Sequence, residues 1–263
     1  MMSRLNSLFI LLGINFRKLF RTISCLPWFI TSYLKFRKQY KYNNSEKEFH
    51  LGKLYPCLDD RNDTSGTAGG HYFHQDLLVA QKIYAAQPDR HVDIASRVDG
   101  FVAHVASFRE IEAMDIREQK NNLKNIKFIK MDIMHNIDPR YFNYCDSVSC
   151  LHALEHFGLG RYGDDICAGG YLKGIENISK LLKHGGIFYL SVPIGPQRIE
   201  FNAHRVFSID YVLNIVSDAF QLKSFAFIDD KGDLHDDVKL DNENARQNYG
   251  CVFGRGGFEL IKK

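Results

Sequence analysis

The first 42 residues of this sequence contain no aspartate and no glutamate, although they carry eight cations. The cations are Arg4, Arg17, Lys18, Arg21, Lys35, Arg37, Lys38 and Lys41. Because the whole chain has a formal charge of +3, the remaining residues 43–263 sum to −5. A mildly acidic body lacks the clustered basic surface of nucleic-acid-binding domains, so we expect no nucleic-acid partner.

Long apolar runs and closely spaced cysteine pairs are also missing. The longest uncharged run in the basic segment, Thr22 to Leu34, has 13 residues, whereas a helix needs about 20 apolar residues to cross a bilayer. The six cysteines contain no C-x-x-C pair and no regular spacing, which argues against a zinc knuckle and against a disulfide framework. We therefore expect a protein of the reducing cytosol with no metal site and no membrane-spanning helix.

Residues 1–42 alternate apolar patches with cations, a pattern typical of a basic amphipathic helical arm. The large apolar side chains can enter the headgroup layer of a membrane while the cations meet anionic lipid. These side chains are Phe9, Leu11, Leu12, Phe16, Phe20, Trp28, Phe29, Tyr33 and Phe36. The alternative is that the arm packs on the body or on a partner protein. We expect a cytoplasmic protein that associates peripherally with the inner face of the membrane.

Residues 43–70 are predicted to form a linker and an irregular loop, because "NNSEKE" and "DDRNDTSGTAGG" are rich in turn-forming residues. From residue 71 onward, segments with the apolar pattern of strands alternate with helical segments. The predicted strands are 91–95, 111–115, 126–131, 147–150, 187–192, 222–228 and 249–261, and the predicted helices are 77–86, 100–106, 172–182 and 209–216. This alternation predicts an α/β domain over residues 71–263 with a Rossmann-like, doubly wound, mostly parallel sheet of seven strands.

One aspartate accompanies each of four successive predicted strands: Asp93 lies in the first, Asp115 ends the second, Asp132 follows the third and Asp146 begins the fourth. In a doubly wound sheet, ligands bind beyond the carboxyl ends of the strands, near the point where the strand order reverses. Asp115 follows Asp93 by 22 residues, a separation typical of a nucleotide-binding turn and the acid that binds ribose. Asp132 is placed to accept a hydrogen bond from an adenine amino group. Each aspartate alone is equally compatible with a helix cap or a turn.

This ordered set of acids and the segment "LLKHGGIFYLSVP" resemble class I S-adenosylmethionine-dependent methyltransferases. More narrowly, "HYFHQDLLVAQKI", "EHFGLGRYGD" and "FNAHRVF" are similar to domain-of-unknown-function family 268, which occurs in nematodes and in bacterial surface-polysaccharide gene neighbourhoods. The resemblance implies S-adenosylmethionine as cofactor and O-methylation of a surface glycan or of its precursor. The alternative is a non-catalytic protein of this fold that binds or scaffolds a glycan-assembly partner at the membrane.

The turn after the first predicted strand departs from the superfamily pattern DxGxGxG. When that pattern starts at Asp93, Ala95, Arg97 and Asp99 stand at its glycine positions, and Gly100 follows. Glycine serves there because the backbone bends with positive φ or approaches the ligand closely. Arg97 can instead bind the methionine carboxylate of the cofactor bidentately, or it can simply pair with Asp99.

Together, these observations predict a set of cofactor-binding residues around the first three strand ends and after the fourth strand. The set is Asp93, Ala95, Ser96, Arg97, Gly100, Asp115, Asp132, Ile133 and His152. Four further polar residues lie before the first strand and can close over the pocket, namely His71, His74, Gln75 and Asp76. Alternatively, these four residues only mark a helix N-terminus, with Asp76 as its first-turn acid.

The segment "LHALEH" contains H-x-x-E-H, the inverted zinc-protease motif. We do not interpret it as a metal site, because the motif needs a long helix and a third ligand, whereas here it directly follows a strand. Transfer of a methyl group to a hydroxyl needs a base near neutral pKa, for which His156 is the first choice and His204 the second. The full set of predicted catalytic residues is His156, His204, Glu155, Arg161, Tyr162, Asp164 and Arg205.

Overall fold

The computed structural model describes residues 16–42, 49–58, 60–62, 65–66 and 68–263. The chain divides into two compact units, Met1–Thr67 and Ala68–Lys263. Four residues of the predicted amphipathic arm, Arg4, Phe9, Leu11 and Leu12, lie outside the described residues. Each unit is considered by itself.

Among its described residues, the first unit has two successive helices, α2 (Phe16–Ser24) and α3 (Leu26–Tyr42), and one short turn of helix, η2 (Asp60–Asn62). The side chain of Cys25, at the junction of α2 and α3, is buried. The Arg61 guanidinium lies 4.8 Å from the centre of the Trp28 ring, so residues near η2 contact α3. Within the part of the chain that is described, no helix has the length and apolar character needed to cross a membrane.

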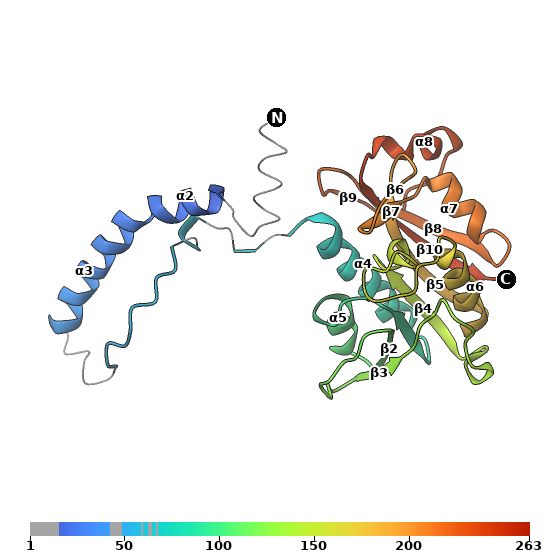
Figure 1. Ribbon diagram of the computed structural model, residues 1–263, viewed down its shortest axis with the longest axis horizontal. Coiled ribbons are helices and arrows are strands. Elements are labelled where there is room, and N and C mark those ends of the chain that lie inside the picture. The colour runs from blue at the N-terminus through green and yellow to red at the C-terminus, as the bar shows by residue number, and fades with distance from the viewer. Residues whose placement is uncertain (1–15, 43–48, 59, 63–64, 67) are drawn as a thin grey trace. The chain divides into compact units, whose positions relative to one another are not determined.

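The second unit is built on an eight-stranded sheet with the strand order β3-β2-β1-β4-β5-β10-β8-β9 (Figure 1). Strands β1 to β5 pair in parallel, and β10 lies antiparallel between β5 and β8. The strands are β1 (His91–Ile94), β2 (Ile111–Asp115), β3 (Ile126–Lys130), β4 (Cys145–Leu151), β5 (Leu182–Ile194), β8 (Phe220–Ile228), β9 (Leu234–His235) and β10 (Gly254–Lys262). The strand order reverses between β1 and β4, which places the expected ligand site beyond the carboxyl ends of these two strands.

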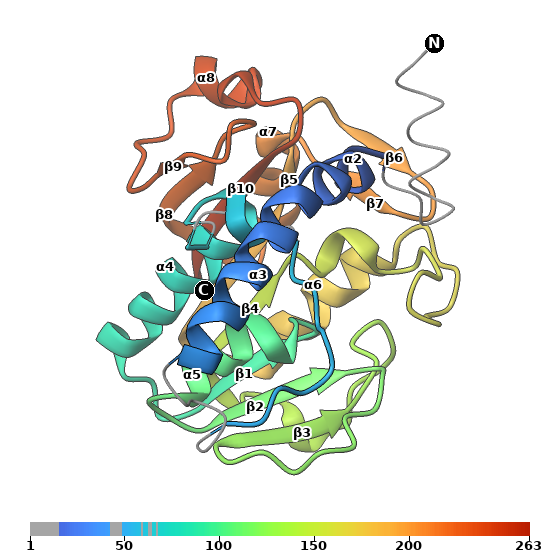
Figure 2. The same cartoon turned by 90° about the vertical axis from the view of Figure 1, so that its left-hand side faces the viewer.

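Helices cover both faces of this sheet (Figure 2). The helices of this unit are α4 (Gly70–Ala86), η3 (Val98–Val102), α5 (Ala103–Ala106), η4 (Pro139–Tyr141), η5 (Leu154–His156), α6 (Gly170–Leu181), α7 (Ile209–Val216), α8 (Asn242–Arg246) and η6 (Asn248–Gly250). Successive residues of β5 show the two layers: Tyr189 belongs to the core beneath α4 and α5, whereas Phe188 and Leu190 belong to the core beneath α6 and α7. Neighbouring residues of a strand point to opposite faces, so both faces of the sheet are buried.

The predicted doubly wound, mostly parallel sheet is confirmed, with one strand more than the seven expected. The additional strand is the two-residue β9, which pairs with β8 through Phe227 and Ile228. A separate hairpin of β6 (Arg198–Glu200) and β7 (His204–Val206) follows β5. Asp146 stands at the beginning of β4, as predicted. It therefore lies at the end of the sheet opposite to the expected site, where it pairs with Lys183 (2.7 Å), and it does not join the other acids at the cavity.

Candidate active site

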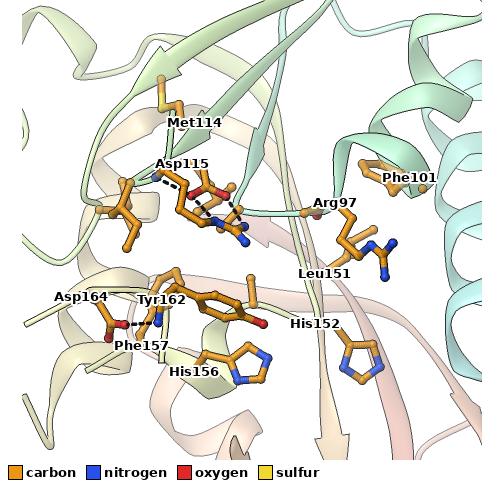
Figure 3. Close-up of a pocket in the computed structure, with 18 of the residues that line it drawn as sticks. Arg97, Phe101, Met114, Asp115, Leu151, His152, His156, Phe157, Tyr162 and Asp164 are labelled. Atoms are coloured by element: carbon orange, nitrogen blue, oxygen red, sulfur yellow. Dashed lines mark hydrogen bonds and ion pairs between the residues drawn. The ribbon is translucent and has the colours of Figure 1, made fainter. Parts of the chain in front are cut away.

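A cavity of about 570 Å³ opens beyond the carboxyl ends of β1, β2 and β4 (Figure 3). Cavities of this size bind drug-sized ligands in many proteins. Most of the predicted site residues line it, namely Ala95, Ser96, Arg97, Gly100, Asp115, Asp132, Ile133, His152, His156, Tyr162 and Asp164. Five predicted residues do not: Asp93, Glu155, Arg161, His204 and Arg205.

The carboxylate of Asp93 shapes the turn after β1. It accepts hydrogen bonds from the Ser96 backbone N–H (3.0 Å), the Ser96 hydroxyl (2.8 Å) and the Ser149 hydroxyl (2.6 Å). Burial raises the pKa of Asp93 to about 6, although these hydrogen bonds oppose the shift. Asp93 was expected to bind the cofactor directly. Because its oxygens face the serines beneath the loop, it instead holds the loop in shape.

Ala95 stands where the superfamily pattern has its first glycine, and its φ is +60°. A non-glycine residue in this left-handed region costs about 1 kcal/mol or more. The turn forms nonetheless, since the Ala95 N–H donates to the Met114 carbonyl (2.8 Å). The altered turn therefore keeps the glycine-type backbone conformation in spite of the alanine side chain.

Ala95→Gly is expected to raise the free energy of unfolding by up to about 1 kcal/mol and to leave cofactor binding equal or tighter. Relief of the left-handed strain outweighs the greater entropy of glycine in the unfolded chain. Urea denaturation measures the change. Ala103→Gly is the matched control, because Ala103 has a helical φ of −64° and its replacement should destabilise by about 0.5–1 kcal/mol. Equal destabilisation by both variants would contradict the strain at Ala95.

Arg97 and Asp99 form an exposed pair at the edge of the cavity. The Nε and Nη2 atoms of Arg97 donate to the two carboxylate oxygens of Asp99 at 3.0 and 2.7 Å. The side chains are 70% and 71% exposed, so solvent screens the pair and little free energy opposes its separation. Arg97 thus lines the cavity, as expected. Its guanidinium is paired with Asp99, which is the alternative arrangement that the sequence also allowed.

Asp115, at the end of β2, faces the cavity and is bound by Arg117. The guanidinium donates to both carboxylate oxygens, from Nε at 3.0 Å and from Nη2 at 2.6 Å. Arg117 also lies over the Tyr162 ring, 4.6 Å from its centre. A ribose that bound Asp115 through both hydroxyls would have to displace Arg117, a residue that the sequence did not single out.

The predicted adenine-binding residue, Asp132, lies after β3 and lines the cavity. One of its carboxylate oxygens accepts from the Met134 N–H at 2.8 Å, which closes a short turn. The other lies 3.4 Å from His135 Nε2. Ile133, the next residue, is buried and contributes an apolar wall.

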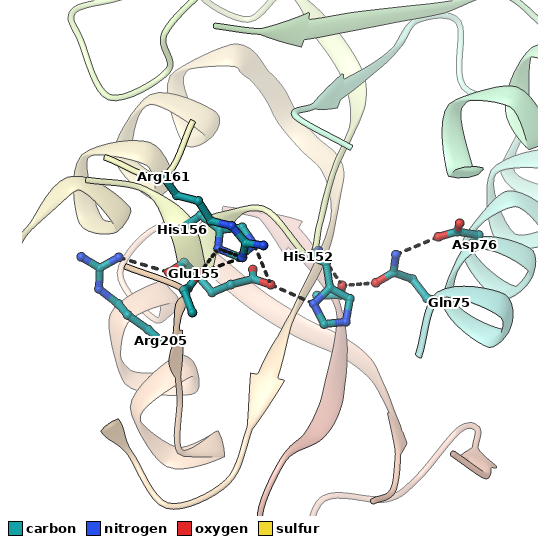
Figure 4. A network of polar contacts seen from close by, with 9 residues as sticks. Gln75, Asp76, His152, Glu155, His156, Arg161 and Arg205 are labelled. Atoms are coloured by element: carbon teal, nitrogen blue, oxygen red, sulfur yellow. Dashed lines mark hydrogen bonds and ion pairs between the residues drawn. The ribbon is translucent and has the colours of Figure 1, made fainter. Parts of the chain in front are cut away.

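Two histidines and one glutamate form the polar wall after β4 (Figure 4). The Oε1 atom of Glu155 lies 2.8 Å from His152 Nδ1 and 3.7 Å from His156 Nε2. Burial alone would raise the pKa of Glu155, but the neighbouring His152 and His156 outweigh it and hold the pKa below its usual value. The three residues belong to the end of β4 and the single turn η5, not to the long helix that the H-x-x-E-H zinc motif requires.

His156 has the tautomer of a general base. Its Nδ1 lies 2.7 Å from the carbonyl oxygen of Ala203, which can only accept, so Nδ1 carries the proton. Burial lowers the pKa of His156, although the charge of Glu155 and the bond to Ala203 oppose the shift. The ring is therefore neutral near pH 7, with a lone pair on Nε2. Figure 3 shows His156 beside Tyr162 and His152, on the side of the cavity opposite Asp115.

The segment "GLGRYGD" forms a tight loop around the carboxylate of Asp164. This carboxylate accepts from the backbone N–H groups of Gly158 (2.8 Å), Gly160 (3.1 Å) and Tyr162 (3.2 Å). Gly158 has a φ of +76°, and a Cβ there would lie 1.9 Å from the Cys167 carbonyl oxygen. The loop therefore depends on this glycine, and Asp164 holds Tyr162 at the mouth of the cavity.

Three of the predicted catalytic residues support the site from outside the cavity. Arg205 is 4% exposed and donates to the carbonyls of Glu155 (3.3 Å), Phe157 (2.7 Å) and Ala168 (3.1 Å). The other two are Arg161, which donates to the Ala203 carbonyl (2.9 Å), and His204, whose Nε2 lies 3.2 Å from Glu200. Their interactions with backbone and with the β6–β7 hairpin explain why they do not reach the cavity.

Helix α4 contributes a face that the sequence identified only in part. Tyr72, Gln75 and Asp76 line the cavity, at the spacing that places residues on one side of a helix. His71, which does not line it, stacks on His152 with ring centres 5.7 Å apart. Burial lowers the pKa of His71 to about 4. This helix face closes the cavity next to the turn after β1.

Comparison with known proteins identifies one family and several distant structures. The family model described as "Caenorhabditis protein of unknown function, DUF268" matches residues 86–249. No curated protein matches the sequence.

Several solved structures show a distant likeness to the chain. The 1,6-didemethyltoxoflavin-N1-methyltransferase of Burkholderia thailandensis, with bound S-adenosylhomocysteine, is 14% identical over 72% of this chain and 78% of its own, with a TM-score of 0.47. The N-methyltransferase NodS of Bradyrhizobium japonicum is 11% identical over 73% and 88%, with a TM-score of 0.46. A putative methyltransferase of Bacillus halodurans is 16% identical over 72% and 98%, with a TM-score of 0.48.

Proposed function

The chain belongs to the DUF268 family, and from this membership and the cavity described above we propose that it is an S-adenosylmethionine-dependent methyltransferase. One observation carries the proposal: Asp115 at the end of β2, Asp132 after β3 and the turn after β1 all line one cavity at the point where the strand order reverses. Such a series suits an adenosyl ligand, with a carboxylate for the ribose diol and another for the adenine amino group.

The residues present fit this cofactor along its length. Asp115 would hold the ribose and Asp132 the adenine, while Arg97 would bind the methionine carboxylate once it leaves Asp99. When bound, the cofactor supplies a methyl group on a positively charged sulfur. His156 would accept the proton of the acceptor hydroxyl on Nε2, while Ala203 keeps the proton on Nδ1. Glu155, 3.7 Å from Nε2, would stabilise the resulting imidazolium.

The acceptor is proposed to be a hydroxyl of a surface glycan or of its lipid-linked or nucleotide-linked precursor. The support is the resemblance to bacterial family members that occur beside surface-polysaccharide genes. The partly exposed rings of Tyr72 and Tyr162 at the mouth of the cavity offer flat surfaces on which a sugar ring can lie. A non-catalytic glycan-assembly scaffold is the second candidate. It is favoured by two ion pairs, Arg97–Asp99 and Arg117–Asp115, because they occupy side chains that would otherwise bind the cofactor.

Transfer of a radioactive methyl group from S-adenosylmethionine tests the proposal. The purified protein is incubated with labelled cofactor and a panel of nucleotide sugars, lipid-linked sugars and polysaccharide fractions, and calorimetry measures binding of S-adenosylhomocysteine. We expect binding of S-adenosylhomocysteine and label in a glycan fraction. Absence of binding at millimolar concentration would contradict the cofactor, whereas binding without label in any fraction would favour the scaffold.

The arm of α2 and α3 is proposed to bind anionic membranes. Nine large apolar side chains of these two helices are exposed, namely Phe16, Leu19, Phe20, Ile23, Leu26, Ile30, Leu34, Phe36 and Tyr42. Four cations of α3, Lys35, Arg37, Lys38 and Lys41, are exposed as well. Apolar insertion and attraction to anionic lipid act together in such arms, and each cation near the surface contributes about 1 kcal/mol.

Protein lacking residues 1–42 is expected to stay folded but to lose co-sedimentation with phosphatidylserine-containing vesicles. The second unit keeps its own two buried cores, so its folding does not need the arm. The matched control replaces Lys35, Arg37, Lys38 and Lys41 with glutamine in the intact chain, which should remove most salt-sensitive binding and keep the apolar part. Equal pelleting of truncated and intact protein, or binding indifferent to lipid charge and salt, would assign the arm to packing or to a protein partner.

A further inference from the structure

Asp76 is a buried acid on the face of α4 that closes the cavity, 6% exposed. It stands in the second turn of a helix that begins at Gly70, and the first turn of α4 contains no acidic residue. The helix dipole acts mainly on the first turn, so stabilisation of the helix N-terminus does not explain this carboxylate.

A chain of side chains holds the Asp76 carboxylate in place (Figure 4). Its Oδ1 accepts from the Gln75 amide at 2.8 Å, and the Gln75 oxygen accepts from the Ser191 hydroxyl of β5 at 2.5 Å. On the other side, a Cβ at position 100 would lie 3.0 Å from Asp76 Oδ2. Gly100 thus lets the second oxygen approach the turn after β1.

Among the described residues, no lysine, arginine or histidine nitrogen forms an ion pair with Asp76. Burial raises its pKa, whereas the bond from Gln75 and the more distant charges of Arg255, His104 and His152 oppose the shift. A buried carboxylate without a cation in contact is costly, so a ligand cation would stabilise it strongly. Its free oxygen can accept a hydrogen bond from such a cation.

We propose that Asp76 binds the ammonium group of the methionine part of S-adenosylmethionine. The inference rests on the proposed function. Asp115 and Asp132 belong to the adenosine end of the cavity, whereas Asp76 lies beside Gly100, at the turn where the methionine part would end. Of the two positive groups in this cofactor, only the ammonium has N–H donors for a carboxylate oxygen. Arg97 on the same turn would bind the carboxylate. The ammonium and the carboxylate of the amino acid group would thus each be bound by a side chain of opposite charge.

Calorimetry of Asp76→Asn with two ligands tests the assignment. S-adenosylhomocysteine carries the ammonium, whereas 5′-methylthioadenosine has the same adenosine and sulfur without the amino acid group. The variant should bind S-adenosylhomocysteine about tenfold to hundredfold more weakly and methylthioadenosine as wild type does, because one charge-assisted hydrogen bond is lost. The ratio of the two affinities is the readout, since it does not depend on the fraction of folded protein.

Two further variants complete the test. Asp76→Glu keeps the charge and should keep most of the preference for S-adenosylhomocysteine. Glu176→Gln is the matched control: Glu176 is an exposed acid on α6 that pairs with Lys180, and its replacement should leave both affinities unchanged. If the ratio of the two affinities in Asp76→Asn equals that of wild type, the assignment of Asp76 is overturned. Binding of both ligands by the wild-type protein would then still support the proposed function. Failure of wild-type protein to bind either ligand would overturn both.

Discussion

His156→Gln is expected to slow methyl transfer about 10²- to 10⁴-fold while leaving S-adenosylhomocysteine affinity close to that of wild type. The Nε2 atom is the unprotonated nitrogen of a ring whose tautomer is set by the Ala203 carbonyl, and general bases in this position contribute rate enhancements of that size. Glutamine keeps a hydrogen-bonding side chain of similar reach but cannot accept a proton. The rate is measured by label transfer to the acceptor fraction.

The pH dependence of the wild-type rate gives a second measurement. Because burial lowers the pKa of His156, the neutral base persists below the usual histidine value of 6.5, and the rate should fall only as the pH drops through the lowered pKa. This acid limb should be absent in His156→Gln. His204→Gln is the matched control, since His204 lies outside the cavity beside Glu200. If His204→Gln instead removed the activity, and His156→Gln did not, the base would have to be reassigned.

The fold could be predicted from the sequence where local pattern and burial agree. The predicted bounds of β2 and α7 are those observed. Three residues of β2, Ile111, Ala113 and Met114, are apolar and buried, and α7 has an apolar stripe bounded by its Ser208 cap. The strand predicted at 187–192 extends over Leu182–Ile194, since its Gly185, with a φ of +77°, is absorbed into the strand instead of ending it. The β6–β7 hairpin has three residues per strand, too few to show a period.

The sequence could predict which loops form the candidate site, but not which contacts the individual side chains make there. Strand-end acids follow from sequence order, yet whether a carboxylate faces the cavity depends on residues distant in the chain. Asp93 turns towards Ser149, 56 positions away, and therefore shapes the loop. Arg205 likewise reaches carbonyls of the segment 155–168, a pairing that no local pattern encodes. Tertiary packing decides such roles.

Asp115→Ala is expected to weaken binding of S-adenosylhomocysteine by about 2 to 4 kcal/mol, about 30- to 1,000-fold in Kd. The carboxylate at the end of β2 would accept both ribose hydroxyls, and its removal takes away two charge-assisted hydrogen bonds inside the cavity. Calorimetry measures the loss. Affinity equal to wild type would place the ribose elsewhere and contradict the assignment of the adenosine end.

Arg117→Ala separates loss of a ligand contact from disturbance of the loop. In the structure Arg117 occupies both carboxylate oxygens of Asp115, so it competes with a ribose for the same acceptors. Its removal should therefore leave S-adenosylhomocysteine affinity equal or tighter, opposite in sign to Asp115→Ala. If instead both variants weakened binding to a similar extent, the Asp115–Arg117 pair would act by holding the loop after β2, and Asp115 would not be a direct ribose ligand.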